Sequence, residues 1–303
     1  MGGNILGIER QTAENNIIRS LFSMVRYRFF LFAGIFPYLL GQAMAFNAAK
    51  SLDWRYFWWG FLGIFLVLIG VELFNEYFDA KEGGDRIFSQ DPIHVPCHFF
   101  PLGVLVFSLA FLIGLYVTSK VGWPILLFSF LGFLGAYFYV GPPIRWIYRG
   151  LGEMVIAISY GPFMVLGSYY LQAHKITLVP ILPSLICGLS IFCLAILNEI
   201  PDYYQDRLVG KKNLVVRLGR QKSIKLLSLS LASLFILLLL SVVWAKAPLS
   251  ALLPLFLIYW IVRSLAKVKK DYDNPQVFRS LINAVVVIYL VIVCSLGIGY
   301  MGG

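Results

Sequence analysis

Long apolar stretches separated by short polar segments dominate the pattern of residues along this chain. Nine windows are each long enough to cross a bilayer core of about 30 Å as a helix. They are residues 29–49, 56–78, 99–118, 121–141, 151–172, 177–200, 223–245, 248–266 and 281–300. The windows are continuously apolar rather than alternating with period two, which argues against a membrane β-barrel. The pattern therefore predicts an all-α, polytopic membrane protein with nine transmembrane helices in one bundle.

Composition supports this class of protein. The 303 residues are 59% hydrophobic and 13% charged, with a mean hydropathy of +0.80, whereas soluble domains have roughly 25% charged residues. The net charge is +10, but the basic residues are spread over short loops, so nucleic acid is not an expected partner. The four cysteines include no CxxC pair, and we expect them to serve helix packing. We expect a single domain, residues 1–303, surrounded by membrane lipid.

The distribution of Lys and Arg predicts how the bundle is oriented. Five of the 25 Lys and Arg residues fall on one side of the predicted topology, and all the others fall on the side of the N-terminus. By the positive-inside rule the N-terminus, with residues 1–25 as a leading segment, is cytoplasmic and the C-terminus lies across the cell membrane. No cleavable signal peptide is expected, because the first apolar run is long enough to remain as a span.

A short acidic signature occurs twice, each time at the end of an apolar stretch. The copies are Asn75-Glu76-x-x-Asp79, followed by Asp85, and Asn198-Glu199-x-x-Asp202, followed by Asp206. A carboxylate at a helix centre costs on the order of 2.5 to 3.5 kcal/mol by insertion scales, so such clusters need a compensating partner. Both spans are predicted to run inward. The two clusters should therefore meet on the cytoplasmic face, in active-site loops 79–98 and 201–222.

The residue types of the two clusters favour a divalent cation. If each span stays helical, Asn75 and Asp79 lie one turn apart, and the second motif forms a similar column. All the candidate ligands are hard oxygens, which favour Mg²⁺ over zinc or copper. Mg²⁺ usually completes its shell with water and phosphate oxygens, so two facing clusters suit a diphosphate. The predicted metal ligands are Asn75, Asp79, Asp85, Asn198, Asp202 and Asp206.

Solvated helix caps or partners of nearby Lys and Arg are the alternative interpretation of either motif alone. The repetition makes this a poor joint explanation, although internal repeats are also typical of transporters. Basic residues flank both clusters, as an anionic ligand would require, but cytoplasmic loops are basic in any case.

Three segments resemble the signatures of the UbiA superfamily of intramembrane prenyltransferases, and the resemblance covers nearly the whole chain. They are residues 75–85, 202–207 and 210–219. The segment from Tyr139 to Glu153, followed by Gly161-Pro162, is most similar to the branch that prenylates 1,4-dihydroxy-2-naphthoate in menaquinone synthesis, which includes the vertebrate UBIAD-type enzymes.

This resemblance implies that Mg²⁺ on the six predicted ligands binds a polyprenyl diphosphate, with Asp79 and Asp202 essential to catalysis. Ionisation would give an allylic carbocation, which Tyr139 is expected to stabilise with its aromatic face. An electron-rich aromatic acceptor would then attack carbon one. Glu153 could orient the acceptor or take a proton, and capping a helix N-terminus is an equally plausible role. The expected diphosphate ligands are Lys81, Arg145, Arg207, Lys211 and Lys212.

Other functions remain open from the sequence. A secondary transporter of an anionic solute would place its binding groups near the bilayer midplane rather than at helix ends. A non-catalytic membrane binding protein would not need two intact clusters. Among enzymes, an archaeal ether-lipid synthase that prenylates a glycerol phosphate is the main rival to the naphthoate enzyme.

Overall fold

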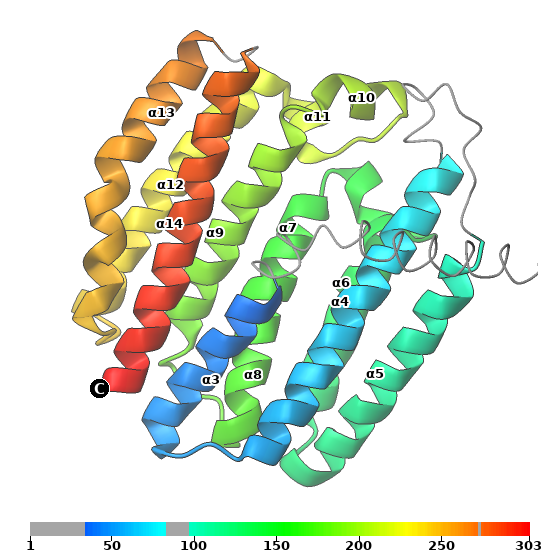
Figure 1. The fold of residues 1–303 in the computed structure, drawn as a ribbon, viewed down its shortest axis with the longest axis vertical. Coiled ribbons are helices and arrows are strands. Elements are labelled where there is room, and N and C mark those ends of the chain that lie inside the picture. Colours follow the sequence, from blue (N-terminus) through cyan, green and yellow to red (C-terminus); the bar gives the residue numbers. More distant parts are fainter. Residues whose placement is uncertain (1–33, 83–96, 272–273) are drawn as a thin grey trace, which may run out of the picture.

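The computed structural model describes residues 34–82, 97–271 and 274–303, and every regular element within these ranges is helical (Figure 1). The longer helices are α3 (Phe36–Ala49), α4 (Trp54–Glu82), α5 (Phe99–Val121), α6 (Pro124–Val140), α9 (Ile181–Glu199), α12 (Arg220–Val243), α13 (Ile258–Lys270) and α14 (Pro275–Gly302). The shorter ones are η3 (Trp146–Arg149), α7 (Gly152–Ile158), η4 (Ser159–Phe163), α8 (Met164–Ala173), α10 (Tyr203–Leu208), α11 (Leu214–Leu218) and η5 (Leu249–Leu257). The predicted all-α class is confirmed.

Seven helical segments in the described part of the chain are long and apolar enough to cross a membrane. They are Trp54–Lys81, Phe99–Val121, Gly152–Ala173, Ile181–Glu199, Arg220–Val243, Leu249–Lys270 and Gln276–Gly302. The other two predicted spans correspond to the shorter helices α3, with 14 described residues, and α6, with 17. The protein is therefore an integral membrane protein, and the count of nine spans stays a prediction.

Several helices begin at polar side chains that cap them. Asp53 Oδ1 accepts the backbone N–H of Arg55 at 2.8 Å just before α4. Asn274 Oδ1 accepts the N–H of Gln276 at 3.0 Å before α14, whose first residue is a proline. Such side chains satisfy amide groups that a helix start leaves without a partner, and proline fits the first helical position.

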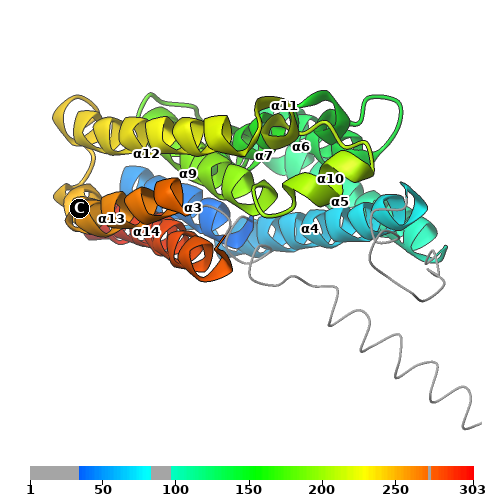
Figure 2. The same cartoon turned by 90° about the horizontal axis from the view of Figure 1, so that it is seen from above.

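The helices run along a common direction and form two rows when seen from above (Figures 1 and 2). Helix α3 packs against α8 and α14, α4 packs against α5, and α9 packs against α7, α12 and α14. Much of the core lies around α9, where Ile186, Ile191 and Ile196 have no exposed surface. Cys187 and Cys193 are buried in the same core, as the packing interpretation expects.

Glycines allow close helix contacts on either side of α8. A Cβ at Gly41 of α3 would lie 2.5 Å from the backbone oxygen of Val165 in α8. A Cβ at Gly161, in the π-helical turn before α8, would lie 2.6 Å from the backbone nitrogen of Gly188 in α9. These separations leave no room for a side chain at either position. The helices around the middle of the bundle are therefore held at short range by backbone contact.

The second acidic motif lies at a break in the helix. Helix α9 ends at Glu199, and α10 begins only at Tyr203. Pro201 lies between them, and proline has no N–H to continue the hydrogen-bonded ladder. The column of Asn198, Asp202 and Asp206 is expected only if the span stays helical, and the structure shows that this condition is not met. The chain turns at Pro201, and α10 leaves the axis of α9 (Figure 1).

Candidate functional site

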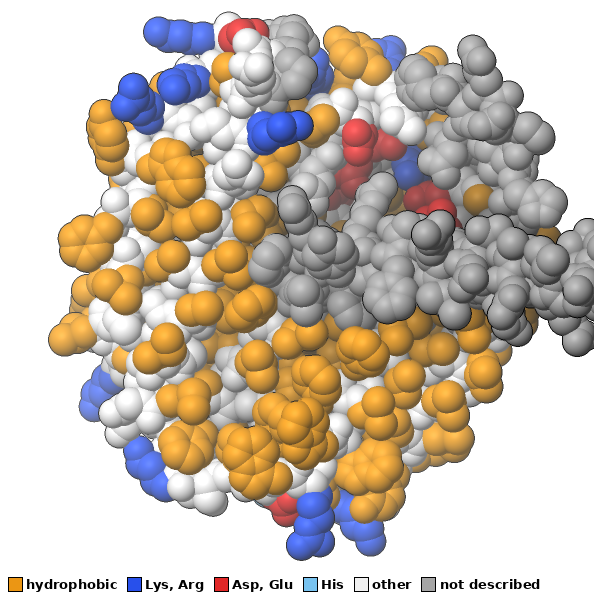
Figure 3. Space-filling view, in the orientation of Figure 1, with side chains coloured by type: hydrophobic (Ala, Val, Ile, Leu, Met, Phe, Trp, Pro, Cys, Tyr) orange, Lys and Arg blue, Asp and Glu red, His pale blue; other side chains and the backbone are white. Residues whose placement is uncertain are grey.

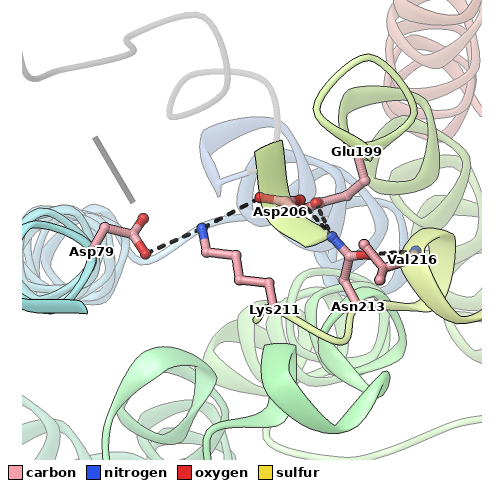
Figure 4. A network of polar contacts seen from close by, with 6 residues as sticks. All are labelled: Asp79, Glu199, Asp206, Lys211, Asn213 and Val216. Carbon is pink, nitrogen blue, oxygen red and sulfur yellow. Dashed lines mark hydrogen bonds and ion pairs between the residues drawn. The ribbon is translucent and has the colours of Figure 1, made fainter. Parts of the chain in front are cut away.

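One acid from each acidic motif contacts the Lys211 ammonium (Figure 4). Lys211 Nζ lies 3.2 Å from Asp79 Oδ1 and 3.8 Å from Asp206 Oδ1. Asp79 belongs to α4 and Asp206 to α10, so the contact joins the two copies of the signature across the bundle. Figure 3 shows acidic and basic side chains in a hollow at the same end of the molecule, with hydrophobic side chains covering the middle. The expectation that the two clusters meet is confirmed for this pair of acids.

Asn213 is the buried centre of the polar network on the side of the second motif. It has no exposed surface, and its Nδ2 donates to Asp206 Oδ2 at 2.7 Å and to the Glu199 carboxylate. Its Oδ1 accepts the backbone N–H of Val216 at 2.7 Å and caps α11. The sequence interpretation did not assign a role to Asn213, although an Asn directly before a short helical segment is an N-cap signal.

Glu153 of α7 accepts a hydrogen bond from the start of α11. Only 2% of this residue is exposed, and its Oε1 accepts the backbone N–H of Leu214 at 2.8 Å. Its Oε2 is buried and has no hydrogen-bond partner among the described residues. Glu153 also lies in the first turn of its own helix, α7. The hydrogen bond of Glu153 is therefore made to the start of α11, its negative charge lies at the N-terminal end of α7, and one carboxylate oxygen is left available.

The charge on Lys211 is maintained by the acids around it. Burial by itself would lower the pKa of this ammonium group, but the negative charges of Asp79, Asp206 and Glu199 outweigh burial. Its pKa is therefore raised above the usual value, and the side chain is protonated at neutral pH.

The predicted metal ligands include residues that the structure places apart and one that it does not describe. Within residues 34–82, 97–271 and 274–303, no three acidic, His or Cys side chains lie close enough together to hold a metal ion. Asn198 and Asp202 are exposed at the break between α9 and α10, and Asp85 lies outside the described residues. The six-ligand arrangement therefore stays a prediction.

The residues present nevertheless fit a Mg²⁺ ion. Asn75 Oδ1, one helical turn before Asp79, is buried and has no hydrogen-bond partner among the described residues. This amide oxygen, together with the carboxylates that contact Lys211, is a hard-oxygen donor set of the kind that Mg²⁺ prefers.

Apart from Lys211, the predicted diphosphate ligands lie near aromatic rings or are exposed. Lys81 Nζ lies 5.8 Å from the centre of the Tyr77 ring, and Arg145 Cζ lies 5.8 Å from the centre of the Tyr148 ring. The Arg207 guanidinium donates a long hydrogen bond of 3.5 Å to the Tyr203 hydroxyl. Arg207 and Lys212 are both exposed.

Tyr139 lies at the end of α6, close to the acidic groups. Its hydroxyl is within electrostatic range of four carboxylates, those of Glu199, Glu153, Asp79 and Asp206. A Cβ at Gly152 would lie 3.0 Å from Cε2 of the Tyr139 ring, so the first residue of α7 packs directly against that ring. The structure therefore places Tyr139 near the acidic groups, where the family resemblance implied that it would lie.

An apolar cavity of about 680 Å³ lies next to this polar site, between α4, α5, α6 and α8. Phe74, which precedes Asn75, and Tyr137 line the cavity near the acidic groups. Its lining on α4 extends from Phe74 back to Trp59, roughly 20 Å of helix at about 1.5 Å per residue. Phe111 and Phe130 line it and are also exposed, which indicates that it opens between α5 and α6.

Comparison with known proteins shows relatives that are named as prenyltransferases. The chain is 28% identical over 247 residues, 80% of each chain, to a 2-carboxy-1,4-naphthoquinone phytyltransferase of Synechocystis. It is also 28% identical, over 68% of each chain, to a 1,4-dihydroxy-2-naphthoate octaprenyltransferase of Bacillus subtilis. A further match at 28% identity, covering 65% of this chain and 59% of the relative, is UbiA prenyltransferase domain-containing protein 1 of Xenopus tropicalis.

Solved structures share the fold at lower sequence identity. A digeranylgeranylglyceryl phosphate synthase superposes with a TM-score of 0.68 at 16% identity, covering 94% of this chain and 99% of the other. A UbiA homolog from Archaeoglobus fulgidus bound to DMAPP and Mg²⁺ gives a TM-score of 0.60 at 14% identity, covering 91% and 98%. The model of the UbiA prenyltransferase family matches residues 34–300. Because this match spans most of the chain, the protein belongs to the UbiA prenyltransferase family, with relatives in its menaquinone-synthesis and UBIAD-like branch, and is a prenyltransferase.

Proposed function

We propose that this enzyme catalyses the Mg²⁺-dependent transfer of a polyprenyl group from a polyprenyl diphosphate to an aromatic acceptor, 1,4-dihydroxy-2-naphthoate or a similar quinone precursor. The observation that carries the proposal is the meeting of both acidic motifs at Lys211 beside a long apolar cavity. A polar site for the diphosphate and an apolar site for its chain are what such a donor requires.

The acidic motifs are the proposed binding site of the diphosphate end. When bound there, Mg²⁺ would neutralise the negative charge that develops on the leaving group. The proposed ligands are Asn75, Asp79, Asp85, Asn198, Asp202 and Asp206. Positively charged side chains add to this neutralisation in the proposed site, because they are the usual partners of phosphate oxygens. They are Lys81, Arg145, Arg207, Lys211 and Lys212.

The proposed reaction breaks one bond and forms another at carbon one of the donor. The C–O bond breaks, and its electron pair leaves with the diphosphate. The aromatic acceptor supplies the electron pair of the new C–C bond, and its ring then loses a proton. Tyr139 is the proposed stabiliser of the allylic cation through its ring face, which is electron-rich. The carboxylate of Glu153, with one oxygen available, is proposed to orient the acceptor or take the proton.

The cavity is proposed to hold the prenyl chain of the donor. Its lining is almost entirely apolar, and its opening between α5 and α6 would let a long chain continue into the lipid. Apolar walls also exclude water, which would otherwise capture the carbocation. The names of the naphthoate prenyltransferases at 28% identity support the aromatic acceptor. The archaeal ether-lipid synthase remains the alternative, and its 16% identity supports a shared fold only.

We also propose nine spans in the cell membrane, with the N-terminus cytoplasmic and the C-terminus on the opposite side. Figure 1 supports this topology, because α4 and α9 end on the same side of the bundle as α10 and α11. The loops 79–98 and 201–222 would then face the cytoplasm, where a water-soluble diphosphate leaving group can depart.

The test is an assay of purified protein in detergent with Mg²⁺, geranylgeranyl diphosphate and each candidate acceptor in turn. We expect diphosphate release and prenylated 1,4-dihydroxy-2-naphthoate, and no product with geranylgeranylglyceryl phosphate. Asp79→Ala and Asp202→Ala should abolish turnover, whereas Asp271→Ala, which removes an exposed carboxylate after α13, should not. No turnover with any acceptor, or full activity in both motif variants, would overturn the proposal.

A further inference from the structure

Lys211 Nζ lies where the two acidic motifs face each other. It is 3.2 Å from Asp79 Oδ1 and 3.8 Å from Asp206 Oδ1, and these oxygens belong to two of the proposed metal ligands. Without a cation between them the two carboxylates would repel each other, especially in a partly buried site where water screens charge poorly. The ammonium group therefore supplies the charge that a metal ion would supply at this position.

The backbone around Lys211 is anchored, while its side chain is long enough to move. The Lys211 N–H donates to the backbone oxygen of Asp206 at 2.9 Å, and Gly210 adopts a left-handed φ of 78° that makes the turn. Two residues later, Asn213 fixes the chain to Asp206. A lysine side chain has four flexible methylene groups, so its ammonium can change partners while this backbone stays in place.

We propose that Lys211 is an internal cation that occupies the metal position until a diphosphate binds, so that metal and diphosphate enter together. Mg²⁺ and the ammonium group compete for Asp79 Oδ1 and Asp206 Oδ1. An incoming diphosphate offers Lys211 a new anionic partner and offers Mg²⁺ the phosphate oxygens that complete its shell. Each ligand then raises the affinity of the other by the same factor. This inference rests on the proposed function, because it needs a metal-diphosphate substrate.

The first measurement is Mg²⁺ binding to the full chain in detergent without diphosphate, by titration calorimetry. Lys211→Met removes the competing ammonium group and should lower the Mg²⁺ dissociation constant about tenfold, within the usual range of coupling between sites. Lys222→Met is the matched control. Lys222 is exposed on α12, and the ion pairs of Asp79 and Asp206 described above involve Lys211 instead. Its Mg²⁺ affinity should equal that of the unmodified protein.

The second measurement repeats the titration with a geranylgeranyl diphosphate analogue in which sulfur replaces the oxygen on carbon one, so that the bond resists cleavage. The analogue should raise the Mg²⁺ affinity of the unmodified protein strongly and that of Lys211→Met much less. The melting temperature gives a separate readout. Lys211→Met should melt lower without Mg²⁺, because the buried Asp206 and the partly exposed Asp79 lose a positive partner. Mg²⁺ should then raise the melting temperature of this variant more than that of the unmodified protein.

A second variant covers the case in which Lys211→Met does not fold. Lys211→Gln also removes the positive charge, but its side-chain amide can donate hydrogen bonds to the two carboxylates, so it should fold and show the same gain in Mg²⁺ affinity. Equal Mg²⁺ affinity of Lys211→Met and the unmodified protein, with and without the analogue, would overturn this inference while leaving the proposed function intact. Failure of the unmodified protein to bind Mg²⁺ even with the analogue would overturn both.

Discussion

The side-chain amide of Asn213 donates a 2.7 Å hydrogen bond to Asp206 Oδ2 and connects the second acidic motif to α11. The same side chain contacts Glu199 and caps α11 through Val216. Three separate parts of the chain therefore depend on a single residue with no exposed surface. Burial of a polar group stabilises a protein only where its hydrogen bonds are made, and here they are made.

Replacement of Asn213 by alanine should reduce both stability and activity. The loss of a cap and of two buried hydrogen bonds leaves carboxylates without a donor, so we expect a loss of about 1 to 3 kcal/mol in the free energy of unfolding. Activity should fall further than stability, because Asp206 loses its orientation. Melting temperature and prenyl transfer measured on the same preparation test this expectation.

Asn274→Ala is the matched control for Asn213. Asn274 also caps a helix, by accepting the N–H of Gln276 at 3.0 Å, but it is located at the start of α14 and contacts none of the acidic motifs in the described residues. Asn274→Ala should lower the melting temperature, because it removes a helix cap as Asn213→Ala does, and it should keep full activity. Equal activity of the two variants would contradict the role of Asn213 in orienting Asp206.

Glu153→Gln should separate the two roles considered for Glu153. A glutamine keeps an oxygen that can accept the Leu214 N–H, whereas Glu153→Ala loses it. If Glu153 works by holding α11, Glu153→Gln keeps activity, and Glu153→Ala loses it together with the hydrogen-exchange protection of the Leu214 amide. If Glu153 takes the proton, Glu153→Gln loses activity although that amide stays protected.

Gly152→Val should displace the Tyr139 ring. A Cβ at Gly152 would lie 3.0 Å from Cε2 of Tyr139 and 3.1 Å from the backbone Cα of Ile147, and the backbone atom cannot move aside. Overpacking of this kind costs about 1 to 3 kcal/mol. We expect a lower melting temperature and a lower kcat with geranylgeranyl diphosphate. In Gly297→Val, a Cβ meets nothing within 4 Å, so both quantities should be unchanged within error.

The placement of both motifs on one face could be predicted from the sequence because it depends on topology. Two spans that run in the same direction end on the same face, and the structure brings Asp79 and Asp206 together there at Lys211. Tyr139 and Glu153 could be placed near the site from the family resemblance, and the prediction of an all-helical membrane fold followed from the length of the apolar windows.

The partners within the site could not be predicted, because they depend on the turn at Pro201. A continuous helix would have pointed Asn198, Asp202 and Asp206 in one direction, but the break between α9 and α10 separates them. That turn brings Glu199 and Asp206 to the same amide of Asn213. Lys211 was expected to contact the diphosphate, and its contact with carboxylates from both motifs follows from three-dimensional packing that sequence spacing does not contain.

Gly132→Leu should shorten the prenyl chain that the enzyme accepts. Gly132 lines the cavity between α4, α5, α6 and α8, and a Cβ there meets nothing within 4 Å, so a larger side chain fits without displacing its neighbours. The added methyl groups would fill space that a long prenyl chain needs, and one methylene in an apolar pocket changes discrimination by about 1 to 3 kcal/mol. We expect kcat/KM for geranylgeranyl diphosphate to fall at least tenfold relative to that for geranyl diphosphate. Gly297→Leu, outside the cavity lining, should leave the ratio as it is, and an unchanged ratio in Gly132→Leu would show that the prenyl chain binds elsewhere.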